Sequence, residues 1–105
     1  MSNPNVPWYP LAEIQRLVQE GERYFGTLAA RQVIERGWAP DDVWECILGM
    51  DATCFCKSGI SRHPLHVGET WDAYKRDLYG RRTWFELTVD TRVQKLKLIS
   101  VHPTK

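Results

Sequence analysis

The hydrophobic pattern of this chain changes its period near Asp51, and that change constrains the fold more than any other feature. Before Asp51, apolar residues recur every three to four positions, as they do on the buried side of a helix. After it, apolar and polar residues alternate, as they do along half-buried strands. We therefore predict an α+β fold in which three N-terminal helices pack on one face of a mainly antiparallel sheet formed by the C-terminal half.

Three segments show the helical pattern, namely residues 10–21, 27–37 and 41–49, and a glycine stands at or near the end of each. Between the first two, Tyr24–Phe25 is expected to be a short extended link. The residues expected to face the core are Leu11, Ile14, Leu17 and Val18, then Ala30, Val33 and Ile34, then Val43, Cys46 and Ile47.

Four segments are expected to form strands: residues 53–58, 70–79, 82–89 and 95–102. The stretch 59–69 contains two glycines and a proline and is expected to be a loop. Short links between the last three strands indicate an antiparallel meander. Alternation in the stretch 82–89 puts Phe85, Leu87 and Val89 on one face and Trp84, Glu86 and Thr88 on the other.

The length of 105 residues favours one domain over residues 10–105, with residues 1–9 as a flexible lead. No apolar run approaches the roughly 20 residues that a membrane-spanning helix needs, so we expect no membrane association. The first residues lack the basic and apolar regions of a secretory signal. Three cysteines, an odd number, suit a reducing compartment, and we expect a cytoplasmic protein without structural disulfides.

Cys54, Cys56, His63 and His66 lie close enough in sequence to suggest a zinc site. Their C-x-C and H-x-x-H spacings are not those of a standard zinc finger, however. Packed free thiols are the preferred interpretation, and we expect no metal and no cofactor.

Charge is distributed unevenly along the chain. Residues 1–74 hold 6 Lys/Arg and 10 Asp/Glu, whereas residues 75–105 hold 8 Lys/Arg and 3 Asp/Glu. A basic C-terminal part could form a surface for an anionic polymer such as RNA, or the two parts could neutralise each other in the fold.

Four cations surround a turn expected at Gly80, and aromatic residues lie among them. A hairpin there would gather the cations at one end of the sheet, where they could contact several phosphates. Aromatic rings offer stacking surfaces for unpaired bases. The residues concerned are the cations Lys75, Arg76, Arg81 and Arg82 and the aromatics Tyr74, Tyr79 and Trp84. An exposed basic hairpin without a ligand, with Trp84 in the core, is the alternative.

The loop region and the end of the chain carry groups suited to phosphodiester cleavage. Histidine exchanges protons near neutrality, and lysine or arginine stabilises developing phosphate charge. The candidates are Lys57, Arg62, His63, His66 and His102. A solvated loop with surface histidines explains the same residues without any activity.

Several short stretches, taken in order, resemble the MqsR family of toxins from type II toxin–antitoxin systems. They are PLAEIQRLVQEG (10–21), TLAARQVIERGWAPDDVWECILGM (27–50), CFCKS (54–58), TWDAYK (70–75), WFELTV (84–89) and KLISVH (97–102). The resemblance therefore covers nearly the whole chain, and it depends on order and spacing rather than on any single motif. It implies a small α+β RNase of the RelE-like kind, a cytoplasmic mRNA interferase that needs neither ribosome nor metal and is neutralised by a cognate antitoxin.

Carrying over the family's functional positions gives one match and three departures. Lys57 matches the family's catalytic lysine in its Phe-Tyr-Lys-Ser motif. Asp72 stands where the family has glutamine, Trp84 where it has tyrosine, and His102 where it has lysine. Trp84 has no O–H to donate, and His63, His66 or Tyr74 could replace the missing group.

The expected catalytic residues are therefore Lys57, His102, His63, His66 and Tyr74. Those expected to bind RNA are Lys75, Arg76, Arg81, Arg82, Trp84 and Asp72. The expected activity is endonucleolytic cleavage of single-stranded mRNA by attack of the 2′-hydroxyl. The expected partners are mRNA and an antitoxin protein, with no DNA binding by the chain itself. The alternative is an inactive module on the same fold that binds RNA or a protein.

Overall fold

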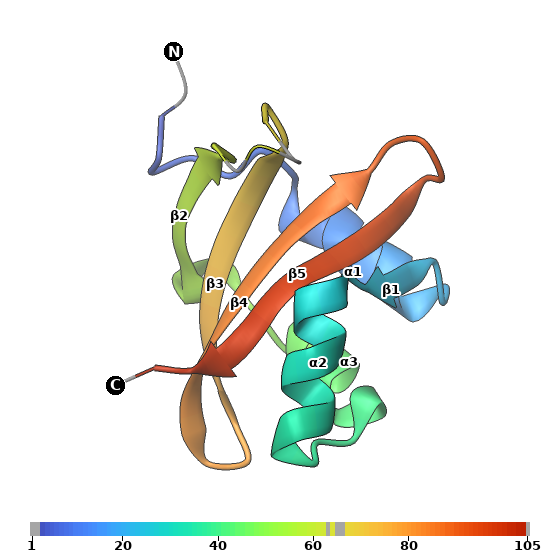
Figure 1. Ribbon diagram of the computed structural model, residues 1–105. Coiled ribbons are helices and arrows are strands. Elements are labelled where there is room, and N and C mark those ends of the chain that lie inside the picture. Colours follow the sequence, from blue (N-terminus) through green and yellow to red (C-terminus); the bar gives the residue numbers. More distant parts are fainter. Residues whose placement is uncertain (1–2, 63, 65–66, 105) are drawn as a thin grey trace.

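The computed structural model describes residues 3–62, 64 and 67–104. Helices precede most of the strands, which confirms the predicted α+β class (Figure 1). In chain order the elements are α1 (Leu11–Gln19), β1 (Arg23–Phe25), α2 (Thr27–Arg36), α3 (Pro40–Leu48), the short 3-10 helix η1 (Ala52–Cys54), β2 (Phe55–Ile60), β3 (Thr70–Leu78), β4 (Arg81–Asp90) and β5 (Lys95–Pro103).

The five strands form one sheet in the order β1-β5-β4-β3-β2. Neighbours from β2 to β5 are antiparallel, as predicted for the C-terminal half. The link predicted at Tyr24–Phe25 belongs to β1, which pairs with β5 in parallel and makes the sheet mixed. The turn at Tyr79–Gly80 joins β3 to β4 through two residues with positive φ, the geometry that matches the twist of a tight hairpin.

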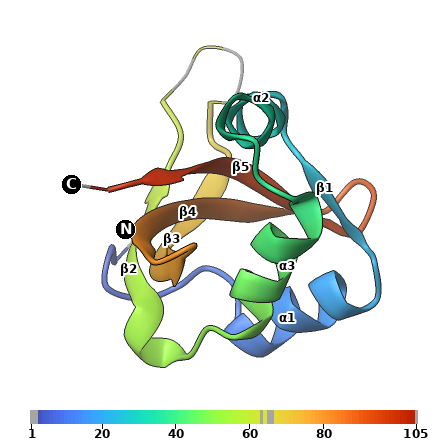
Figure 2. The same cartoon turned by 90° about the horizontal axis from the view of Figure 1, so that it is seen from below.

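The predicted placement of all three helices on one face is wrong. Figure 2 shows α2 on one side of the sheet and α1 and α3 on the other. On the side of α2, Gln32 of this helix accepts a hydrogen bond from the backbone N–H of Val101 at 2.8 Å and donates one to Ser100 Oγ at 3.3 Å. On the other side, Gln15 of α1 donates to three backbone carbonyls at the end of α3, those of Ile47, Leu48 and Met50.

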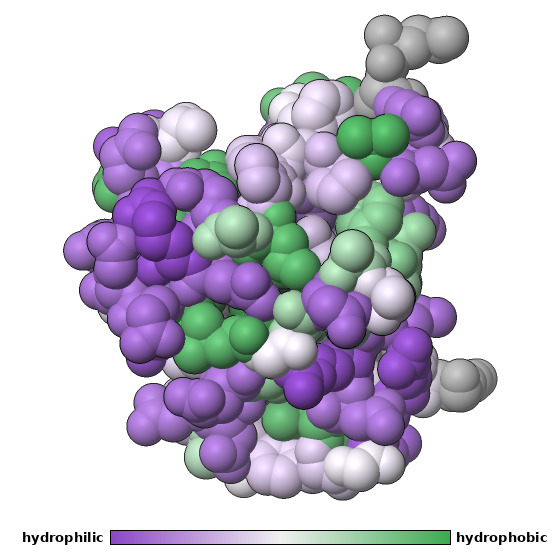
Figure 3. Space-filling view, turned by 180° about the vertical axis from the view of Figure 1, so that it is seen from behind, coloured by the Kyte–Doolittle hydropathy of each residue, from purple (hydrophilic) through white to green (hydrophobic). Residues whose placement is uncertain are grey.

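The core lies between the sheet and the pair α1 and α3. Most residues predicted to face it do so, including Ile14, Leu17, Val43 and Ile47. Phe85 and Leu87 of β4 meet them, as the alternation of that strand predicted. On α2 the prediction was partly wrong: Val33 is buried as expected, but Ala30 is only half-buried, Ile34 is 79% exposed, and Ala29 is buried instead. Seen from behind, the surface over α1 and α3 is mainly hydrophilic, with small separate apolar areas (Figure 3).

Residues 3–9, predicted to be a flexible lead, are instead held against β2 and β3. Ser58 donates its backbone N–H to Pro4 O at 3.0 Å and its hydroxyl to Val6 O at 2.8 Å. The Asp72 carboxylate accepts the N–H groups of Trp8 and Tyr9 at 2.9 and 3.0 Å. The segment is ordered because polar side chains of the sheet satisfy its backbone groups. Within the described residues, no helix has the length and hydropathy needed to cross a membrane.

Because Asp72 is buried, the free energy of unfolding should depend on pH through its carboxyl group. Burial raises the pKa of Asp72, and the hydrogen bonds from Trp8 and Tyr9 oppose that effect only in part. A carboxyl whose pKa is raised by folding stabilises the fold at low pH, and this contribution is lost as pH rises through the raised pKa. In chemical denaturation from about pH 4 upward, an Asp72→Asn protein should gain stability relative to wild type as pH rises.

Asp51→Asn is a control of opposite sign. Hydrogen bonds from Thr53 lower the pKa of Asp51, so the stability of this variant relative to wild type should fall as pH rises through the acid range below the ordinary carboxyl pKa. A constant difference in unfolding free energy between wild type and Asp72→Asn at every pH would contradict the role assigned to Asp72.

Candidate functional site

A β-bulge in β2 determines which way Lys57 points. Phe55 pairs with Tyr74 of β3, whereas Lys57 pairs with Ala73, so Cys56 is an extra residue in the edge strand. Phe55 packs edge-on against the Tyr74 ring on the core side, at 5.5 Å between centroids. The bulge therefore turns Lys57 to the opposite face, the one on which α2 lies. We call this the open face, because α2 covers only part of it, over β5.

Trp84 of β4 is the centre of the open face. The ammonium groups of Lys57 and Lys75 lie 5.7 and 5.8 Å from the centre of its ring; Lys75 comes from the neighbouring strand β3 and Lys57 from the edge strand β2 beyond it. His102 of β5 pairs with Trp84 in the strand register and so stands on the same face from the other side. The fold thus brings together Lys57, Lys75, Trp84 and His102, all of which the sequence indicated.

Glu86 adds a carboxylate that was not among the predicted site residues. It accepts a hydrogen bond from Trp84 Nε1 at 3.2 Å and pairs with Ser100 in the register. It therefore lies diagonally across from His102, a relation in which Cβ atoms are about 7–8 Å apart. Alternation along β4 puts Trp84 and Glu86 on one face, so the sequence carried the signal for this residue.

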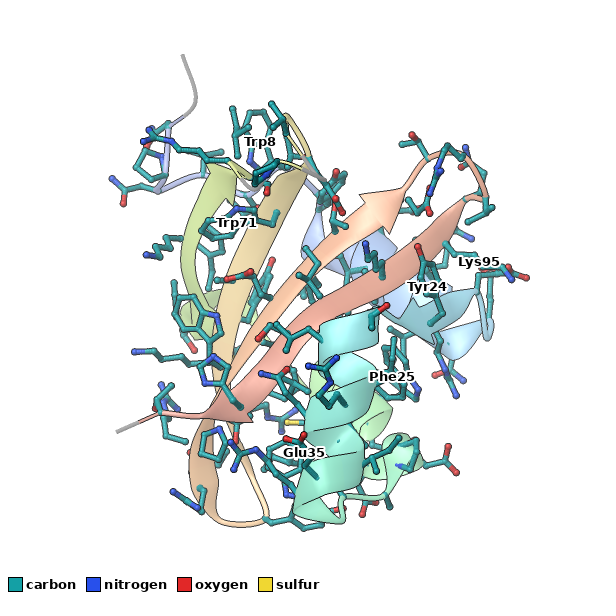
Figure 4. The ribbon with its side chains drawn as sticks, viewed as in Figure 1. Trp8, Tyr24, Phe25, Glu35, Trp71 and Lys95 are labelled. Atoms are coloured by element: carbon teal, nitrogen blue, oxygen red, sulfur yellow. The ribbon has the colours of Figure 1, made fainter. Side chains whose placement is uncertain are left out.

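Trp71 of β3 is a second aromatic side chain on the open face that sequence reasoning did not select. The ammonium group of Lys57 is 6.0 Å from its ring centre. Opposite it in β2 stands Gly59, where an added Cβ would lie 2.3 Å from Trp71 Cζ2. The ring therefore occupies the space that the missing side chain leaves. Figure 4 shows Trp71 close to β2 and β3.

Asp72, Tyr74 and Arg76 do not belong to this site, and their predicted roles are corrected. They alternate with Trp71, Ala73 and Lys75 along β3 and so point to the core side. Tyr74 is 1% exposed, and burial raises its pKa to about 12, which makes it unsuited to proton transfer with a surface ligand.

The other two have structural roles in place of the predicted contacts with RNA. Asp72 is fully buried and binds the N-terminal segment. Arg76 donates to the carbonyl of Cys46 at 2.8 Å, at the end of α3, where helix carbonyls lack partners within the helix.

Arg81 and Arg82, which follow the hairpin turn, point to opposite faces of the sheet. Arg82 shares the face of Trp84, and its Nη1 is 3.8 Å from Oδ1 of Asp77. Arg81 points to the other face and lines a small cavity with Glu35 and Trp38. The predicted cluster of four cations is therefore reduced to Lys75 and Arg82 on the open face.

The remaining candidates concern the loop and the thiols. His63 and His66 lie outside the described residues, and their predicted roles stay predictions. Cys54 and Cys56 are half-buried free thiols. Among the residues that the structure describes, no group of three or more His, Cys, Asp or Glu side chains is placed to hold a metal ion.

Comparison with protein-family models and with curated proteins gives no match to this chain.

The stability of the fold should depend on glycine at position 59, because the ring of Trp71 occupies the space beside it. A Gly59→Ala change forces a methyl group into the space of the indole, and overpacking of this kind costs about 1–3 kcal/mol of unfolding free energy. In a Trp71→Ala background the space is free, and the same change should cost much less. Urea denaturation of the four proteins of this double-mutant cycle measures the difference. An equal cost of Gly59→Ala in both backgrounds would show that the two residues do not interact.

Proposed function

We propose that the protein is an endoribonuclease that cleaves single-stranded mRNA through attack of the 2′-hydroxyl, as the toxin of a type II toxin–antitoxin system. The observation that carries the proposal is the gathering of Lys57, His102 and Glu86 around Trp84 on one open face. The RelE-like fold relationship and membership of the MqsR family are part of the proposal. They draw on the sequence resemblance alone.

The chemistry needs two proton transfers and one cation. The 2′-oxygen forms a bond to phosphorus while the bond from phosphorus to the 5′-oxygen breaks. One group accepts the proton of the 2′-hydroxyl, and another gives a proton to the departing 5′-oxygen. Glu86 suits the first role and His102 the second, while Lys57 stabilises charge on the phosphate oxygens. The products are a 2′,3′-cyclic phosphate and a 5′-hydroxyl end.

The other residues of the open face suit substrate binding. Lys75 and Arg82 would contact neighbouring phosphates. Trp84, which stands where the MqsR family has tyrosine, would stack on a base rather than transfer a proton. A toxin of this kind would act in the cytoplasm on mRNA and be held inactive by an antitoxin partner, as the resemblance implies.

Removal of Lys57 should abolish most of the activity. A Lys57→Ala protein should cleave single-stranded RNA about 10²- to 10³-fold more slowly, the usual effect of losing one group that stabilises transition-state charge. The assay follows cyclic-phosphate and 5′-hydroxyl ends by gel. Arg16→Ala is the matched control, because it removes one positive charge from α1, on the other side of the sheet. Cleavage by Lys57→Ala at the control rate would exclude Lys57 from the site.

His102 is tested by the shape of the pH–rate profile. A His102→Gln protein should be slower by about 10²-fold or more and should lose one limb of the profile, because a proton-transfer group imposes its own titration on the rate. Glu86→Gln should remove the other limb. If both variants kept the wild-type profile, proton transfer would have to be assigned to other residues.

A binding module that does not turn over RNA is the second candidate. The two tryptophans of the open face, Trp71 and Trp84, favour this candidate, because base stacking and phosphate contacts can hold a single strand without any chemical step. Incubation of the protein with a mixed-sequence RNA separates the two functions. Binding without new 5′-hydroxyl ends would favour the module.

A further inference from the structure

A groove lies beside the proposed cleavage site, between the first turn of α2 and the open face. Its volume is about 650 Å³. Trp71 and Glu86 belong both to its lining and to the surroundings of Lys57 and Trp84. A ligand that extends away from the cleavage site along the sheet would therefore enter this groove next.

The groove is lined by both apolar and charged side chains. Trp71, Leu28 and Ile99 supply the apolar part, while Arg31, Lys97, Glu69 and Glu86 supply charges. Leu28 is 48% exposed, so its side chain is available to a ligand. This mixture suits a flat aromatic ligand with a polar edge better than a wholly apolar one, which would leave charged groups of the lining without partners.

A second β-bulge helps to shape the groove. Glu86 pairs with Ser100 and Leu87 with Leu98, so Ile99 is an extra residue in β5. A bulge changes the direction of a side chain, and here Ile99 lines the groove.

The charges of the groove are not all paired with each other. The Lys97 ammonium is 3.6 Å from a Glu69 carboxylate oxygen. Arg31, by contrast, has no ion-pair partner among residues 3–62, 64 and 67–104. It is exposed and so can contact a phosphate group of the ligand.

We infer that this groove is a nucleotide subsite, in which an unpaired base stacks on Trp71 against Leu28 and Ile99 while Arg31 binds a phosphate. The inference rests on the proposed function for its choice of RNA as ligand. A base within a duplex is stacked on its neighbours and cannot enter a groove of this kind, so the substrate is single-stranded RNA. The nucleotide in the groove adjoins the one whose phosphate lies at Lys57, because the Lys57 ammonium is also the neighbour of Trp71.

Binding of a 2′-O-methyl RNA oligonucleotide of mixed sequence tests the subsite apart from cleavage, because this probe lacks the attacking hydroxyl. Trp71→Ala should weaken binding about tenfold, as expected for the loss of one stacked base, and Trp71→Phe should retain most of the affinity. Trp38→Ala is the matched control, because Trp38 lies at a different cavity, with Arg81 and Tyr79. Circular dichroism checks that each variant is folded.

Arg31→Ala gives a second, independent measurement. It should weaken binding and make the slope of log affinity against log salt shallower by about 0.7, the value for one phosphate contact with a single strand. The Arg31→Ala protein therefore tests the subsite even if the Trp71→Ala protein fails to fold. Annealing the probe to its complement should also weaken binding.

Wild-type affinity in both Trp71→Ala and Arg31→Ala, or equal binding of the single strand and the duplex, would overturn the subsite. Failure of the proposed function looks different. In that case the wild-type protein would bind the probe in a Trp71-dependent way but would release no 5′-hydroxyl ends from unmodified RNA.

Discussion

The position of Lys57 depends on one extra residue in an edge strand. In a regular strand Phe55 and Lys57 would share a face, because residues two apart point the same way. That face is the core, where Phe55 packs against Tyr74, and an unpaired ammonium group there would cost several kcal/mol. Insertion of Cys56 lets Phe55 stay in the core while Lys57 turns outward to Trp84. The contact of Lys57 with Trp84, and with it the role proposed for Lys57, follows from this bulge.

The open face combines small residues with large aromatic and cationic ones. Gly59 leaves room that the ring of Trp71 fills. Two ammonium groups, those of Lys57 and Lys75, lie within 6 Å of the same indole ring. The ring attracts each cation, but the cations repel one another. A phosphate placed between them would relieve that repulsion, which gives a physical reason for an anion to bind at this place rather than elsewhere on the sheet.

The sequence predicted the order of the elements well because each element has its own hydrophobic period. It could not predict the side of the sheet on which α2 lies, since an apolar stripe shows that a helix is buried but not beneath which face. Alternation along β3 already separated Lys75 from Tyr74 and Arg76. The prediction that grouped these residues relied on closeness in sequence and ignored that alternation. The bulges at Cys56 and Ile99 and the binding of residues 3–9 by Ser58 and Asp72 come from tertiary contacts that no local pattern encodes.

The parallel pairing of β1 with β5 has a consequence for how the molecule is made. Residues 23–25 must wait for residues 96–98 before they acquire their strand partner. A chain emerging from the ribosome can form its early helices, but contacts between distant segments close late and slowly. Since β5 also contributes His102, the face that we propose acts on RNA is complete only once β5 has been synthesised and has paired with β4. A nascent chain that still lacks β5 would therefore be unable to act on RNA through this face.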